Sequence, residues 1–164
     1  MSETTATGEL SPFREKVTID FLTLANHVEA VNGLLYMSGG GWTDHNRVIP
    51  ANGQTPISHF GIGASVCVPW NETNQPHRLI LIVENEDATL RVLAAEAQVN
   101  VGRPPQLSPG SEQHAIVGIS VDTVFPRAGV YRLVAELSES GERRTWVFRV
   151  HDVPAMPTMA PLQG

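Results

Sequence analysis

The sequence consists largely of short runs in which apolar and polar residues alternate, separated by glycine, proline and asparagine turns. This two-residue period is the signature of half-buried β-strands. The clearest runs cover residues 17–24, 34–38, 57–68, 78–84, 89–93, 114–124, 130–137 and 143–150. About eight short strands with such turns predict an all-β chain that folds as an antiparallel, immunoglobulin-like β-sandwich.

Five segments carry more specific expectations. Residues 78–84 are continuously apolar, which is typical of a central strand covered on both faces. Residues 130–137 and 143–150 are predicted to form a hairpin across a polar turn. Two stretches, 94–99 and 25–31, are short helix candidates.

Composition predicts the domain boundaries. Residues 1–12 contain few apolar side chains, and residues 153–164 contain three prolines, which lack the N–H that a strand ladder needs. We therefore expect a disordered tail over 1–12, a single β-sandwich domain over 13–152 and a Pro-rich tail over 153–164.

Charge and cysteine content argue against several classes of protein. The net charge of -6 disfavours binding to nucleic acid and to anionic lipid. No apolar run approaches the roughly 20 residues that span a bilayer, and residues 1–10 lack the features of a signal peptide. With a single cysteine, Cys67, no internal disulfide can form, so we expect a cytoplasmic protein.

Residues 125–133 hold a Pro-x-x-Gly-x-Tyr pattern ahead of a strand. Pro126 fixes φ, Gly129 allows a tight bend and Tyr131 begins the strand. The pattern predicts a tyrosine corner, in which the phenol hydroxyl bonds to the loop backbone.

Two tryptophans stand beside polar residues. The first follows three glycines, and a backbone kink there would seat it in the core or in a shallow groove. The second would cap the end of the sandwich. An aromatic side chain with polar neighbours also suits a binding surface. The candidate binding residues are Trp42, Asp44, His45, Arg47, Trp70 and Asn71.

The sequence assigns no catalytic residue, no metal ligand and no cofactor. The six histidines show neither H-x-H nor H-x-x-x-H spacing, although Asp44, His45 and His59 could converge in space. Cys67 lies in an apolar strand, where cysteine is usually an inert small hydrophobe. The glycine run lacks the helix start and lysine of a phosphate loop.

Four segments together resemble an uncharacterised family of small bacterial proteins that is common in actinobacteria. They are the strand end at 25–35, the glycine run with tryptophan at 35–42, the Pro-Trp-Asn-Glu loop at 69–72 and the corner at 126–131. The resemblance covers most of residues 17–150. It implies a β-sandwich in a cytoplasmic bacterial protein, and it implies no activity.

These observations favour a non-enzymatic protein–protein interaction module with an unidentified protein partner, because a sandwich offers end loops and edge strands for binding. A small-ligand or metal-binding protein, or an enzyme, with its site near the Gly39–His45 loop is the first alternative. A structural homo-oligomer formed by pairing of edge strands is the second. Neither nucleic acid nor a membrane is an expected partner.

Overall fold

The computed structural model describes residues 15–156. The tail predicted at residues 1–12, and residues 157–164 of the predicted Pro-rich tail, lie outside the described residues. The elements are β1 (Thr18–Val31), β2 (Leu34–Gly40), β3 (Asp44–Ile49), β4 (Ile57–Pro69), the 3-10 turn η1 (Trp70–Glu72), β5 (Pro76–Asn85), β6 (Arg91–Asn100), β7 (Glu112–Val124), β8 (Gly129–Leu137) and β9 (Arg143–Pro154). The predicted all-β class is confirmed.

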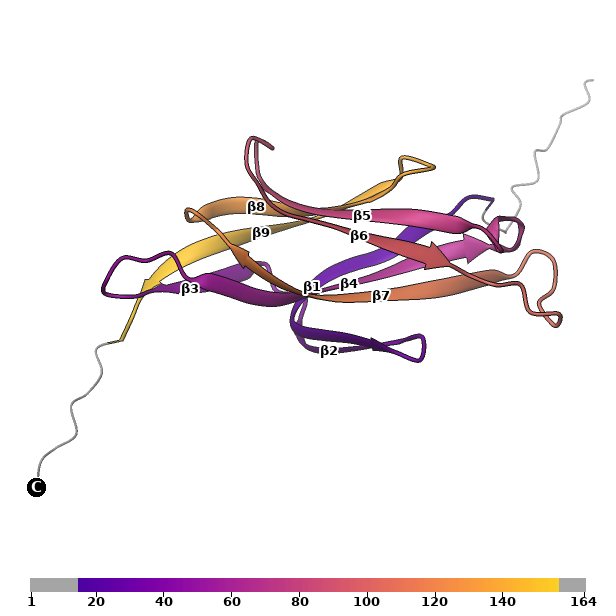
Figure 1. Cartoon of the computed structure of the whole chain (residues 1–164), viewed down its shortest axis with the longest axis horizontal. Helices are drawn as coiled ribbons and strands as arrows, with labels where there is room; N and C mark the ends of the chain where they lie inside the picture. The colour runs from indigo at the N-terminus through magenta and orange to yellow at the C-terminus, as the bar shows by residue number, and fades with distance from the viewer. Residues whose placement is uncertain (1–14, 157–164) are drawn as a thin grey trace, which may run out of the picture.

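The strands form two sheets that pack face to face (Figure 1). The first sheet has the order β2-β1-β4-β7 and the second the order β3-β9-β8-β5-β6. Neighbouring strands are antiparallel, except that β3 runs parallel to β9. The structure is therefore a β-sandwich with one more strand than expected, because β3 was not predicted. Within residues 15–156, no helix has the length and apolar character needed to cross a bilayer.

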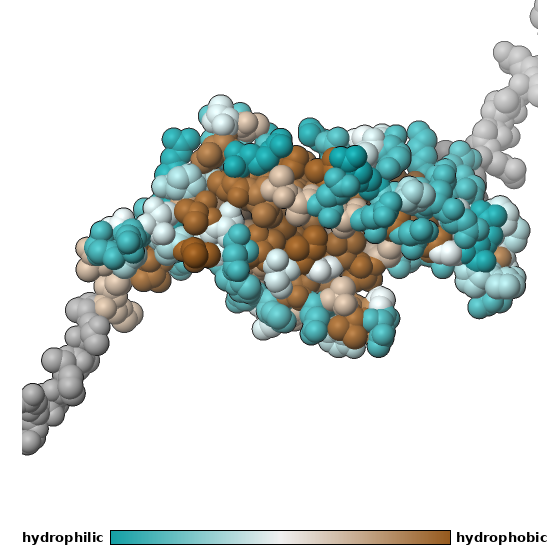
Figure 2. Space-filling view, in the orientation of Figure 1, coloured by the Kyte–Doolittle hydropathy of each residue, from teal (hydrophilic) through white to brown (hydrophobic). Residues whose placement is uncertain are grey.

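The core lies between the sheets and is filled by alternate residues of both. On β5, Leu79, Leu81 and Val83 point inward and are fully buried, while Ile80 and Ile82 are half-buried on the outer face. The predicted interior position of this strand is confirmed by its place between β8 and β6, but its outer face is only half-buried, so the expected cover on both faces is wrong. Figure 2 shows hydrophobic surface where β6 and β7 face one another, so the sandwich is open on that side.

Both helix candidates are wrong. Residues 25–31 belong to β1, where Val28 pairs with Met37, and residues 94–99 belong to β6, where Ala95 pairs with Leu81. A run of six or seven residues fits either a helical or a strand period, so pairing with neighbouring strands decides the structure.

The last strand runs two residues beyond the predicted boundary at 152. Its final residue, Pro154, lies opposite Ile49 in the parallel pair. Proline is compatible with this terminal position, because few further ladder hydrogen bonds depend on its missing N–H.

The end of β1 and all of β2 form a hairpin, residues 26–40, that we call the arm. β1 pairs with β4 as far as Ala25 and with β2 from there to Val31. In Figure 1, β2 lies below β7, outside the two packed layers. The arm covers part of the outer face of the first sheet.

Two glycines make room for the arm. A Cβ atom on Gly61 of β4 would lie 2.8 Å from the backbone nitrogen of Val28, and one on Gly118 of β7 would lie 3.0 Å from that of Ala30. Both separations are too short for an ordinary carbon contact. The absence of side chains at these positions therefore lets the arm rest directly on the sheet.

Candidate functional site

Trp42 lies half-buried at one end of the sandwich. Gly39 and Gly41 have φ angles of 59° and 81°, and they turn the chain from β2 toward β3. The Trp42 ring packs edge-on against Phe60 and Phe148, with centroids 5.9 Å and 5.6 Å apart. The predicted kink that seats this tryptophan is thus present, and its indole N–H is buried without a hydrogen-bond partner.

The next two candidate residues point into the protein from β3. His45 packs against the Trp42 ring with centroids 5.4 Å apart, and its Nε2 lies 2.9 Å from Ser58 Oγ. Arg47 is only 6% exposed. Its guanidinium pairs with Asp152 and donates to the Phe125 carbonyl. Both side chains therefore stabilise the end of the sandwich from within.

Asp44 lies at the surface of the same strand. Its carboxylate accepts hydrogen bonds from His151 Nε2 at 2.7 Å and from the Thr43 hydroxyl at 3.0 Å. The bond from His151, followed by that from Thr43, lowers the pKa of Asp44 below its ordinary value. Asp44 is consequently a charged, accessible group beside the half-buried Trp42.

His45 predicts a specific pH dependence of stability. Burial lowers its pKa below the ordinary value of 6.5. As the pH falls through about 6.5, the unfolded chain takes up a proton that the folded chain does not, so the free energy of unfolding decreases until the folded pKa is passed. A His45→Asn variant should therefore show a shallower loss of stability between about pH 7 and about pH 5.

Urea denaturation at several pH values measures this slope. His59→Asn is the control, because His59 is an exposed imidazole on β4. It shows how far the loss of a surface imidazole alone changes the dependence of the unfolding free energy on pH. Equal slopes for the wild type and His45→Asn would contradict the assignment.

Trp70 and Asn71 lie at the opposite end of the sandwich. The length of β4 separates Phe60 from Trp70, a distance of about 30 Å at strand spacing. The Arg103 guanidinium stacks 3.8 Å above the Trp70 ring and donates to the Trp70 carbonyl. Asn71 is exposed and donates to the Glu15 carbonyl at 3.2 Å. The candidate residues therefore form two separate groups.

Asp44, His45 and His59, the residues that could have converged on a metal, each contact a different partner instead. His45 faces Ser58, Asp44 is bound by His151, and His59 Nδ1 lies 2.6 Å from Asp122. A different group does come together among residues 15–156. Asp20, Cys67 and His114 each place one potential ligand atom within 4.8 Å of the other two. Sequence spacing gave no signal of it, because the residues come from three different strands.

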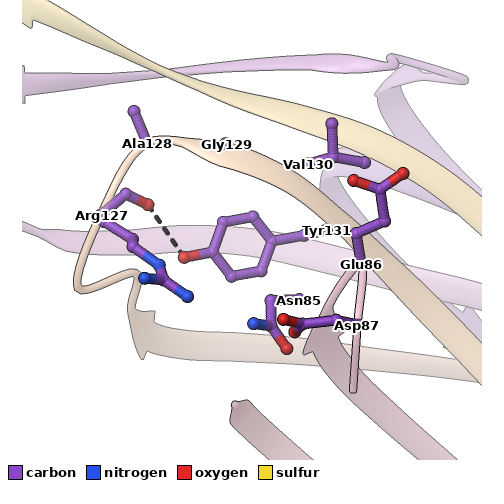
Figure 3. Close-up of a pocket in the computed structure, with 8 residues that line it drawn as sticks. All are labelled: Asn85, Glu86, Asp87, Arg127, Ala128, Gly129, Val130 and Tyr131. Carbon is purple, nitrogen blue, oxygen red and sulfur yellow. Dashed lines mark hydrogen bonds between the residues drawn. The ribbon is translucent and has the colours of Figure 1, made fainter. Parts of the chain in front are cut away.

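Two hollows lie near the tyrosine corner and the first group of candidate residues. One, of about 200 Å³, adjoins the tyrosine corner (Figure 3). There Tyr131 donates a 2.8 Å hydrogen bond to the Arg127 carbonyl, which confirms the predicted corner, and burial raises the pKa of Tyr131. The other, of about 190 Å³, lies beside Thr43 and Asp44. Both are smaller than the roughly 300–1,000 Å³ of most small-molecule sites. A third hollow, of about 360 Å³, is lined in part by Glu72, next to Asn71, and falls at the lower end of that range.

The arm exposes several large apolar side chains. Leu34 and Tyr36 are 59% and 55% exposed, and Met37 and Val31 are also exposed. The register pairs Leu34 with Val31 on the face turned away from the sheet, while Val28 faces inward. Figure 2 shows hydrophobic surface in the region of β2.

β2 is also an edge strand without a neighbour on its outer side among the described residues. The other three edge strands, β3, β6 and β7, each contain charged residues. The β2 sequence, LLYMSGG, contains neither a charge nor a proline. It therefore lacks the usual features that keep an edge strand from pairing.

Comparison with known proteins finds one family. A family of unknown function, DUF6941, matches residues 20–151, which include all six candidate binding residues and the group of Asp20, Cys67 and His114. No curated protein matches the sequence. The resemblance to an uncharacterised family is confirmed.

Proposed function

The chain belongs to DUF6941, a family of unknown function, and we propose that it is a non-enzymatic protein–protein interaction module. It binds an extended segment of a partner protein along β2. The single observation that carries this proposal is the uncharged, apolar edge of β2. The single cysteine and the acidic composition support a cytoplasmic setting for the module.

An edge strand presents a row of backbone N–H and C=O groups to solvent. A partner strand that joins this edge satisfies those groups and gains main-chain hydrogen bonds, while alternate side chains provide specificity. Leu34 and Tyr36 lie on one face of β2, so they offer two apolar contacts at the two-residue spacing of such a partner.

The arm is held ready for binding. It rests on β4 and β7 through the close contacts at Gly61 and Gly118, so little chain needs to be ordered when a partner joins. The partner segment is expected to be extended, uncharged or basic, with apolar residues at alternate positions. The net charge of -6 disfavours an acidic partner.

The first group of candidate residues borders this surface. β2 ends at Gly40, two residues before Trp42, and Asp44 follows at the surface. Trp42 and Asp44 are proposed to form the rim of the interface, with His45 and Arg47 supporting them from inside. Trp70 and Asn71, at the far end, are proposed as contacts only for a larger partner.

A variant with charged residues on the β2 edge tests the proposal. The double variant Leu34→Lys, Tyr36→Lys places two positive charges on β2, a device that natural edge strands use against pairing. The tagged full-length chain is first cross-linked to its partner in a host-cell extract. A synthetic peptide covering the cross-linked partner segment is then titrated against each purified variant. The double variant should bind this peptide about 10-fold more weakly or worse.

Thr145→Lys is the matched control, because Thr145 is also an exposed strand residue but lies on β9, an interior strand between β3 and β8 of the second sheet. It should bind the peptide like the wild type. Equal peptide binding by the double variant, or cross-links confined to the end around Trp70, would contradict the proposal. A stable dimer of the chain alone that the double variant abolishes would favour the homo-oligomer instead.

A further inference from the structure

We propose that Asp20, Cys67 and His114 form a binding site for a divalent cation of the zinc type. The site has three protein ligands and a fourth position open to solvent. It lies on the outer face of the first sheet, beyond the half that the arm covers. It is independent of the interaction surface on β2.

Strand register brings the three residues together. Cys67 of β4 lies directly opposite His114 of β7 on one side and Thr18 of β1 on the other. Asp20 reaches across from β1, and its Oδ2 lies 2.5 Å from His114 Nδ1. The three potential ligand atoms all lie within 4.8 Å of one another, with Cys67 beneath the other two.

A β-bulge aims the carboxylate at this group. The register between β1 and β4 shifts between Ile19 and Phe21. Ile19 and Leu22 both face the core, so the two residues between them are left on the outer side. A regular strand would point one of these two inward, and bulges often re-aim a side chain beside a functional site.

The donor set fits zinc. A thiolate, an imidazole and a carboxylate are all common zinc ligands, whereas calcium and magnesium prefer oxygen alone. The thiolate and the carboxylate carry one negative charge each, so together they neutralise a divalent cation. This neutrality matters because Cys67 is fully buried, and an uncompensated charge there would be costly.

The present geometry requires a small adjustment. Ligands on a tetrahedral zinc ion lie about 3.4 Å apart at normal bond lengths, so the Asp20–His114 contact of 2.5 Å has to open by about 1 Å. The His114 side chain is 54% exposed and has room to turn outward. Its exposed side is also where the fourth, solvent-occupied position would lie.

The same three residue types also occur in nucleophilic catalysis, with cysteine as the attacking group. That reaction needs the sulfur atom to reach a substrate. Cys67 is fully buried in the sheet, so the arrangement suits a cation held over the sulfur better than a thiolate that attacks a substrate.

Cobalt provides a direct test, because Co²⁺ bound to a thiolate in tetrahedral geometry shows a sulfur-to-metal charge-transfer band and intense visible bands. The full-length protein is stripped of metal with a chelator and titrated with Co²⁺. One equivalent should produce both sets of bands, and Zn²⁺ should displace the cobalt. Cys67→Ser should abolish the charge-transfer band. Removal of a residue that only hydrogen-bonds to a metal ligand costs roughly 10- to 100-fold in affinity. Asp20→Asn and His114→Gln each remove a direct ligand, so each should weaken Co²⁺ binding by more than this.

The double variant His59→Gln, Asp122→Asn is the matched control. It removes a histidine–aspartate pair from the same two strands, β4 and β7, at a place without sulfur. It should keep the bands and the affinity of the wild type. If Cys67→Ser fails to fold by circular dichroism, Asp20→Asn and His114→Gln decide the question.

Three results would overturn the proposal: no charge-transfer band in the wild type, unchanged binding in both Asp20→Asn and His114→Gln, or loss of binding in the control. None of them bears on the β2 surface, so the two proposals fail separately.

Discussion

Replacing Phe125 with alanine should lower the free energy of unfolding by about 3–5 kcal/mol, the range found for large aromatic side chains removed from cores. Phe125 is fully buried and lies at the centre of a cluster of rings. Its ring centroid is 4.8 Å from that of Tyr131, 5.9 Å from Phe148 and 6.1 Å from Phe60. These neighbours come from both sheets, so the cavity left behind cannot close without moving the layers apart.

Urea denaturation followed by tryptophan fluorescence measures this loss. Val147→Ala is the control, since a half-exposed side chain on the outer face should change stability by no more than about 0.5 kcal/mol. A Phe125→Ala variant that loses less than about 1 kcal/mol would show that the ring cluster is not a well-packed part of the core.

Replacing Gly61 with alanine should destabilise the protein by about 1–3 kcal/mol, although only one methyl group is added. The new Cβ would lie 2.5 Å from a Val28 methyl and 2.8 Å from the Val28 backbone nitrogen. The side chain can rotate, but the backbone cannot move without lifting the arm from β4. We therefore expect the backbone amides of the arm, residues 26–40, to exchange their hydrogens faster in this variant, while those of β5 and β8 keep their protection.

Gly102→Ala separates this effect from the general effect of removing a glycine. A Cβ on Gly102 would meet nothing within 4 Å, and the residue does not have a positive φ. That variant should be neutral or more stable by up to about 1 kcal/mol, because alanine restricts the unfolded chain. Equal stabilities for the two variants would mean that the arm does not rest tightly on Gly61.

The sandwich could be predicted from sequence because most strands bury apolar residues at every second position. β3 escaped prediction because its inward positions are polar. His45 and Arg47 occupy them, so the strand has no apolar alternation. Arg47 can be buried only because Asp152, 105 residues further along the chain, pairs with it. A pairing over that separation leaves no trace in a local pattern.

The tyrosine corner was predictable for the opposite reason. Its donor, Tyr131, and its acceptor, the Arg127 carbonyl, lie four residues apart in one loop. The corner supports the immunoglobulin-like assignment, which stays a prediction. The cluster of Asp20, Cys67 and His114 could not be predicted, because it depends on the register of three strands and on a bulge in one of them. Hydrophobic patterns indicate which face a residue occupies, and they do not indicate which residue lies opposite.

The parallel pairing of β3 with β9 imposes an order on events during synthesis. Residues 44–49 leave the ribosome early, but their hydrogen-bonding partners are residues 149–154. Until those partners emerge, Trp42 lacks Phe148, and Arg47 lacks Asp152. Contacts between such distant segments form slowly, since a long loop has to close first. The nascent chain therefore carries an unpaired β3 and an incomplete aromatic core until β9 is made, and this is the interval in which a chaperone would have most to protect.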